Sequence, residues 1–154
     1  MNIRKAETKD LSRIAEILVF NNRINYYPIF HDPEYSFGKL QVVTVIDNYL
    51  KNDGILDSIY VYDDGIVKGF IQINNKEIYK LYVDVCFQSL GIGHELIEFA
   101  IRKFNVNCVW VLEKNVRAIS FYGKHGFKMT GKKEFEEGTT EYIVELKTAD
   151  IGQC

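Results

Sequence analysis

The stretch Gln88-Ser89-Leu90-Gly91-Ile92-Gly93-His94 dominates the fold prediction, because it lies between a predicted strand and a predicted helix. Residues 77–84 read as the strand, and apolar residues recur at helical spacing from Ile92 to Phe104. The glycines let a ligand approach the backbone closely. Since the first amides of a helix lack partners within it, this turn is predicted to bind an anion. An ordinary strand-to-helix turn remains the alternative.

Two other phosphate-binding motifs do not fit the chain. A dinucleotide fingerprint requires a third glycine at position 96, which is Leu96 here. A phosphate-binding loop requires Gly-Lys followed by Ser or Thr, and that sequence does not occur. The glycine turn therefore needs a different explanation.

Toward the N-terminus, residues 2–5 are predicted to form a short strand. A helix is expected over residues 8–22, with Thr8 as its cap and one apolar face. The aromatic, proline-broken residues 23–35 are expected to form a loop, and residues 36–51 a second helix.

Around the glycine turn, residues 57–74 alternate with a period of two about Asp63-Asp64-Gly65, which predicts a hairpin. Residues 107–112 read as a strand buried on both faces, 116–125 as a helix and 127–147 as a final hairpin. The order predicts an α/β fold, with a mixed, mostly antiparallel sheet of about seven strands and about four helices on both faces.

The length and the net charge of the chain limit the number of domains and the kinds of partner that we expect. The 154 residues predict one domain over residues 1–154, with a core of about 2–147. A net charge of −2, with basic residues scattered among acids, argues against nucleic acid as a partner. No apolar run reaches the ~18 residues that cross a bilayer, and none resembles a signal peptide, so we expect a cytoplasmic protein without membrane partners.

The histidines and cysteines do not predict a metal site. His31, His94 and His125 have separations that fit no zinc-binding helix motif. The cysteines form no CxxC pair; they are Cys86, Cys108 and Cys154. We therefore expect no metal.

Two linked segments resemble the GNAT superfamily of N-acetyltransferases. Gln88 to Gly93 matches the family's acetyl-CoA motif, which is Arg or Gln, two residues, Gly, one residue, then Gly or Ala. A second segment has the family's Asn115, Ala118, Phe121-Tyr122 pair and closing Gly126-Phe127. The resemblance covers nearly the whole chain, with residues 23–56 matching only in outline, and is strongest to small bacterial members of unassigned substrate.

The resemblance implies where acetyl-CoA binds. Backbone groups of Leu81, Tyr82 and Val83 would pair with the pantetheine arm like an added strand. Amides from Gln88 to His94 would hold the pyrophosphate, and the family's second segment would add contacts from Asn115, Ala118 and Tyr122. The alternatives are a core role for the Leu81 and Val83 side chains and a helix-capping role for Asn115.

The resemblance also implies catalytic roles. Tyr122 would donate a proton to the departing CoA thiolate as general acid. Glu77 lies eleven residues before Gln88, where some family members place a base, and would accept a proton from the amine. A solvated carboxylate at a hairpin turn is the alternative for Glu77.

The acceptor side is expected between the first two helices, where aromatic side chains suit a cationic amine. The predicted residues are Tyr26, Tyr27, Phe30 and His31. The alternative is that these rings fill a hydrophobic gap.

Together these residues predict an acetyl-CoA-dependent N-acetyltransferase, in which a primary amine of a small molecule or peptide attacks the thioester directly in a ternary complex. The alternatives are a non-catalytic CoA-binding or partner-binding module and an acyltransferase that uses another acyl-CoA. Either a monomer or a homodimer is compatible with the sequence.

Overall fold

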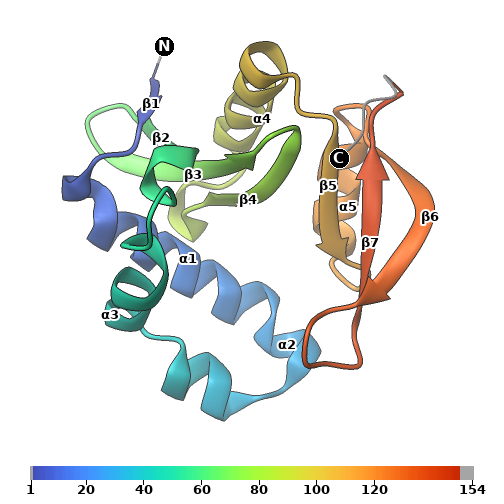
Figure 1. Cartoon of the computed structure of the whole chain (residues 1–154), viewed down its shortest axis with the longest axis horizontal. Helices are drawn as coiled ribbons and strands as arrows, with labels where there is room; N and C mark the ends of the chain where they lie inside the picture. Colours follow the sequence, from blue (N-terminus) through green and yellow to red (C-terminus); the bar gives the residue numbers. More distant parts are fainter. Residues whose placement is uncertain (1, 150–154) are drawn as a thin grey trace. The chain divides into compact units, whose positions relative to one another are not determined.

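The computed structural model describes residues 2–149 (Figure 1), so Cys154 lies outside the described part. It divides into two compact units. The first holds the described residues up to Gln72 together with Lys80–Phe99, and the second holds Ile73–Tyr79 and the described residues from Ala100 onward. The boundaries between the units pass through the two strands Val67–Asn74 and Glu77–Val83 and through the helix Ile92–Phe104. The prediction of a single domain stays a prediction.

The sheet confirms the predicted fold class. Its seven strands have the order β1-β2-β3-β4-β5-β7-β6. The β4–β5 pair is parallel, whereas the β1–β2, β2–β3, β5–β7 and β6–β7 pairs are antiparallel. The strand bounds are β1 Ile3–Lys5, β2 Ile59–Asp63, β3 Val67–Asn74, β4 Glu77–Val83, β5 Cys108–Leu112, β6 Lys128–Phe135 and β7 Tyr142–Lys147.

Five α-helices are formed by the residues that the structure describes: α1 Leu11–Asn25, α2 Tyr27–Phe30, α3 Val42–Val45, α4 Ile92–Phe104 and α5 Val116–Gly123. Shorter helical turns cover Thr8–Asp10, Glu34–Lys39, Ile46–Leu50, Leu56–Ser58 and Val85–Phe87. Over residues 2–149, none of the helices has the length and apolar character of a membrane span.

The predicted loop over residues 23–35 is largely wrong. Helix α1 continues to Asn25, and α2 follows at once because Pro28 stands in its first turn, where a missing N–H is tolerated. The predicted helix over residues 36–51 is confirmed only in part, because helical segments cover most of it but extended backbone at Leu40 and Gln41 divides it. Arg23 donates to the carbonyls of Ser36 and Leu40 at 2.9 and 3.1 Å, which satisfies acceptors at this break.

The start of α1 differs from the prediction as well. Thr8 lies inside the helical turn Thr8–Asp10 rather than capping the helix. Asp10 is 4% exposed, accepts from the Glu7 amide at 2.8 Å and pairs with Arg4 through both carboxylate oxygens. A buried ion pair therefore replaces the predicted threonine cap.

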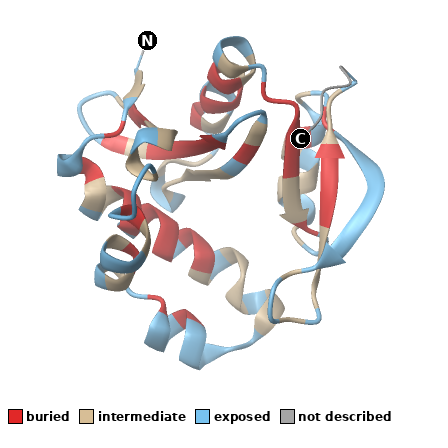
Figure 2. Cartoon of the chain, viewed as in Figure 1, coloured by how far each residue is buried: buried red, intermediate tan, exposed pale blue. Residues whose placement is uncertain are grey.

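The core of the first unit lies between α1 and the strands β2 and β3. Ile14, Ala15 and Val19 form the buried face of α1, and Val61 and Phe70 belong to the same cluster. Figure 2 shows this face of α1 as a buried stripe. Burying each large apolar side chain stabilises the unit by about 1.5–3 kcal/mol.

Gly69 sets how closely α4 approaches β3. A Cβ at this position would lie 3.0 Å from the Tyr82 carbonyl oxygen and 3.3 Å from side-chain carbons of Ile92 and Leu96. We predict that Gly69→Ala lowers the free energy of unfolding in urea by about 1–3 kcal/mol, because neither backbone nor packed helix yields easily. Gly123→Ala is the control, since nothing lies within 4 Å of its Cβ position. Equal stability of the Gly69 variant and the wild type would contradict this packing.

The second unit contains β5, α5 and the β6–β7 hairpin. Val109, Val144 and Leu146 are buried, whereas every residue of the edge strand β6 is exposed, as Figure 2 shows. Strand β5 is less buried than predicted, because Trp110 and Val111 are only half-buried. The hydrophobic core of this unit therefore includes no residue of β6 and only part of β5.

Candidate functional site

The glycine turn in the first unit has the backbone shape of an anion cradle. Ser89 and Gly91 have positive φ angles of 65° and 86°. The Glu95 amide donates to the Gly91 carbonyl at 3.0 Å, so α4 begins directly after the turn. Nothing lies within 4 Å of a Cβ built on Gly91, and residues 89–91 are exposed. A negatively charged group can therefore approach the first amides of α4.

Side-chain amides hold this turn to the rest of the first unit. Gln88 donates through Nε2 to the Val83 carbonyl at 3.0 Å and to Asn21 Oδ1 at 3.2 Å. Asn21 in turn donates to the Val83 carbonyl at 2.9 Å. The side chain of Gln88 thus supports the turn, and its main chain remains the group predicted to face a ligand. The pattern of apolar residues did not predict this role of Asn21, because Asn21 is a polar residue on the otherwise apolar, buried face of α1.

Asp84 fixes the segment between β4 and the glycine turn. Its carboxylate accepts from the Cys86 amide at 2.8 Å and pairs with Arg13 at 2.7 Å. Burial opposes ionisation of Asp84, but these partners outweigh burial and lower its pKa below the usual range. The approach to the turn is therefore held by a charged pair.

Strand β4 continues beyond the two residues that pair with β5. Its register with β5 comprises Glu77 with Cys108 and Ile78 with Val109. Leu81, Tyr82 and Val83 lie further along β4 and are half-buried. The Val83 carbonyl already accepts from Asn21 and Gln88, so other groups of this segment would pair with an added chain.

The predicted acceptor residues form an aromatic group at the end of α1 and in α2. The Tyr26 and Tyr82 hydroxyls lie 3.2 Å apart, and the Tyr82 ring packs on Phe70 at 5.6 Å. Tyr26 makes an edge contact with Phe30 at 6.4 Å, and Tyr27 makes one with His31 at 6.2 Å. Tyr26, Tyr27 and Phe30 are half-buried and His31 is exposed, so parts of these rings are accessible to solvent.

One buried amide beside these rings was not predicted. Asn22 is 8% exposed and precedes Tyr26 by one helical turn, on the same side of α1. Its Oδ1 atom has no hydrogen-bond partner among the residues that the structure describes. An unsatisfied buried acceptor is costly unless a ligand or water donates to it. Sequence patterns could not show that this oxygen is unpaired.

The second unit carries the remaining predicted cofactor residues. Asn115 caps α5, because its Oδ1 accepts from the Ala118 amide at 3.1 Å. Tyr122 is 6% exposed and packs edge-on against Phe121 at 5.3 Å and Phe127 at 5.7 Å. The structure confirms the capping role of Asn115, and its contact with the cofactor stays a prediction.

Glu77 has the environment expected of a general base. It stands at the start of β4, paired with Cys108, and is half-buried. Desolvation raises its pKa above the usual range for glutamate, and the nearby negative charge of Glu145 raises it further. A carboxylate with a raised pKa is a stronger proton acceptor than a solvated one.

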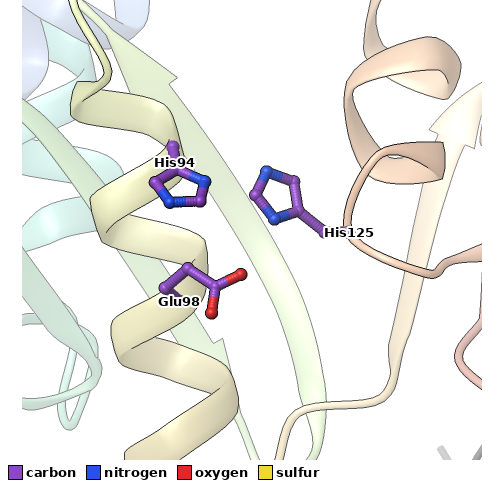
Figure 3. Close-up of side chains that lie close together, drawn as sticks. All are labelled: His94, Glu98 and His125. Atoms are coloured by element: carbon purple, nitrogen blue, oxygen red, sulfur yellow. The ribbon is translucent and has the colours of Figure 1, made fainter.

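Figure 3 draws three side chains with metal-ligating chemistry. His94 and Glu98 are one turn apart on α4 of the first unit, with ligand atoms within 4.8 Å of each other. His125 belongs to the second unit, where it follows α5 and its ring lies 5.1 Å from Phe121. The prediction of no metal therefore stays a prediction.

The predicted residues divide between the two units. The glycine turn, Leu81–Val83 and the aromatic group belong to the first unit, where Asn21 and the tyrosine pair connect them. Glu77, Asn115, Ala118 and Tyr122 belong to the second.

A comparison with family models identifies the class of protein to which this chain belongs. Residues 36–143 match the family model described as an acetyltransferase (GNAT) domain. Because this match covers more than half of the chain, the chain belongs to the GNAT family and is an acetyltransferase. The family predicted from the two sequence segments is confirmed.

Two relatives have the name peptidyl-lysine N-acetyltransferase YjaB. The Salmonella typhimurium protein is 32% identical over 107 residues, which are 70% of this chain and 72% of that protein. The Escherichia coli protein is 32% identical over 84 residues, which are 54% of this chain. This second match spans only 56% of the relative's length.

Solved structures agree with the fold. The solution structure of apo YjaB from Escherichia coli has a TM-score of 0.77 at 20% identity, with 96% of each chain covered. The PaiA N-acetyltransferase from Thermoplasma acidophilum, solved in complex with coenzyme A, has a TM-score of 0.65 at 25% identity. That comparison covers 94% of this chain and 97% of the PaiA chain.

Proposed function

We propose that this chain transfers the acetyl group of acetyl-CoA to a primary amine, with the lysine side chain of a peptide as the preferred acceptor class. The observation that carries the proposal is the open glycine turn before α4, with left-handed backbone at Ser89 and Gly91. The name of the YjaB relatives supports lysine as the acceptor, and the PaiA complex supports coenzyme A as the ligand.

The residues of the first unit fit a CoA ester. The amides from Gln88 to His94 would hold the diphosphate, because a helix start carries positive partial charge and residues 89–91 are exposed. Main-chain groups of Leu81–Val83 would hold the pantetheine arm. Asn115 and Ala118 in the second unit would add contacts. When bound, acetyl-CoA supplies a thioester that is already activated toward an amine.

Three proposed steps complete the transfer. Glu77 accepts a proton from the ammonium group of the acceptor, directly or through a water molecule. The freed nitrogen attacks the thioester carbonyl carbon, so that a C–N bond forms as the C–S bond breaks. Tyr122 gives its phenolic proton to the departing sulfur, and the second proton that the acylated nitrogen must lose returns through solvent to the Tyr122 phenolate. The steps form no acyl-enzyme and assign no role to a metal ion.

The aromatic group of the first unit provides a chemical reason for a cationic acceptor. Ring faces of Tyr26, Tyr27 and Phe30 attract an alkylammonium ion, and His31 lies at the exposed edge. The Oδ1 atom of Asn22 has no hydrogen-bond partner among residues 2–149, and it would accept from an ammonium or a hydroxyl group. The cation–π attraction favours a protonated primary amine over an alcohol.

A thiol-release assay tests this function. Purified protein is given acetyl-CoA with either a lysine-containing peptide or the same peptide with norleucine in place of lysine. We expect CoA release only with the lysine peptide, and mass spectrometry should find one acetyl group on its side chain. Binding of acetyl-CoA without release across a panel of amines would instead indicate a non-catalytic module. Release only with longer acyl-CoA esters would indicate a different acyltransferase.

Replacement of the proposed base should reduce the rate mainly at neutral pH. For Glu77→Gln we expect kcat to fall by about 10²-fold at neutral pH, because a lysine amine with a pKa near ~10.4 is then almost fully protonated. The loss should shrink as the pH rises, since free amine no longer requires a base. Steady-state rates across the pH range measure this effect.

Glu113→Gln is the matched control for this change, because Glu113 is an exposed carboxylate of the same unit. It should leave the pH profile unchanged. A pH-independent loss in Glu77→Gln would contradict the role of Glu77 as a base.

A further inference from the structure

Glu145 is a buried carboxylate for which the proposed reaction has no direct use. It lies on β7 and is 4% exposed. Thr130 donates its hydroxyl hydrogen to Glu145 Oε1 at 2.8 Å. A buried carboxylate is expensive to retain, because its desolvation costs several kcal/mol unless partners compensate for it. Its position therefore calls for a reason beyond packing.

Strand register places Glu145 and Glu77 on one face of the sheet in the second unit. Glu77 pairs with Cys108 on β5, and Cys108 pairs with Lys147 on β7. Trp110, two residues further along β5, pairs with Glu145. Since paired residues share a face and alternate residues return to it, Glu145 lies on the same face as Glu77, in the next row of residues and two strands away across β5.

The bulge in β6 holds the donor to Glu145 in place. The β6–β7 register shifts between Met129 and Lys133, and Gly131 has a φ angle of 93°. Within this bulge, the Lys132 amide donates to Thr130 Oγ1 at 3.2 Å. Bulges commonly redirect a side chain near a functional position. Here the bulge directs the Thr130 hydroxyl to Glu145.

We propose that Glu145 is a positioning residue whose charge makes the Glu77 carboxylate a stronger acceptor for the proton of the amine. The inference rests on the proposed function of Glu77. Like charges disfavour each other's ionised form, which is the direction in which Glu145 acts on the pKa of Glu77. The hydrogen bond from Thr130 holds the Glu145 carboxylate in its position.

Other charged side chains belong to the same face of the sheet as Glu77. Lys147 pairs with Cys108 in the row of Glu77, and Lys128 pairs with Lys147 from β6. Glu134 pairs with Ile143, further from the row of Glu77 than Glu145. Desolvation acts in the same direction as Glu145 on the pKa of Glu77.

The test measures the titration of Glu77 directly, by carbon NMR of protein labelled at glutamate carboxyl groups, with Glu77→Gln used to assign its signal. In Glu145→Gln we expect the pKa of Glu77 to fall, because the neighbouring charge is gone. The acid limb of the kcat/KM profile should move to lower pH with it. Glu134→Gln removes the same charge from exposed β6 and should leave both quantities unchanged.

A second variant guards against misfolding. Glu145→Met has a side chain of similar length that needs no hydrogen-bond partner, so it keeps the measurement available if the glutamine variant fails to fold. An unchanged pKa of Glu77 in the folded variants would overturn the inference. A lowered pKa with an unchanged rate profile would instead uphold the coupling and refute Glu77 as the base. The two hypotheses can therefore fail separately.

Discussion

Tyr122→Phe is expected to lower kcat by about 10²- to 10⁴-fold while leaving the affinity for acetyl-CoA nearly unchanged. The change removes one hydroxyl group and keeps the ring. Because Tyr122 is 6% exposed and held by Phe121 and Phe127, phenylalanine fits the same place. The loss would therefore report the missing proton donor, not a rearranged helix.

Steady-state kinetics and calorimetric binding of acetyl-CoA separate the two quantities. Tyr62→Phe is the matched control, because Tyr62 is 8% exposed and its hydroxyl accepts from Asn2 at 3.3 Å. It should retain kcat. If Tyr122→Phe weakens acetyl-CoA binding and keeps kcat, Tyr122 is a binding residue and the proposed acid is wrong.

Gly91→Glu should abolish measurable acetyl-CoA binding with the fold intact. The new carboxylate would stand beside the amides that are proposed to hold the diphosphate, so like charges would repel each other. The open space around Gly91 lets the side chain fit without a clash. Its φ angle of 86° adds backbone strain, which a control must remove from the comparison.

Gly54→Glu provides that control. Gly54 has a φ angle of 80° and likewise has nothing within 4 Å of its Cβ position, so the substitution brings the same strain and the same charge. We expect it to bind acetyl-CoA like the wild type in calorimetry. Both variants should give the circular dichroism spectrum of a folded chain. Unchanged affinity in Gly91→Glu would refute the cradle.

Most strands and long helices were predictable from periodicity. The hairpin β2–β3, strand β4, helix α4 and the final hairpin all lie where the alternation or helical spacing predicted them. These elements each bury one regular face, so the pattern of apolar residues carries the information. The predictions were least accurate over residues 23–51, where the expected loop is largely helical and the expected helix is interrupted. There, Arg23 binds carbonyls 13 and 17 residues away, and local patterns cannot encode such contacts.

The proposed site was predictable to the extent that it uses main chain. The glycine spacing in Gln88–Gly93 predicted the turn, and Asn115 was predicted as a possible cap of the helix that follows it. The supporting side chains were not predictable. Asn21 reaches Val83 and Gln88 across more than 60 residues of sequence, and Asn22 is notable only because its oxygen lacks a partner among the described residues.

The sequence by itself determined the family, the glycine turn before α4 and the approximate positions of most strands and long helices, since each depends on residues that are close together in the chain. Only the tertiary structure decided the environment of Glu77. Its raised pKa depends on burial and on Glu145, a residue that follows it by 68 positions and comes near through the pairing of β4, β5 and β7. Proton affinity depends on what surrounds a carboxylate in space, and strand pairing brings those surroundings together.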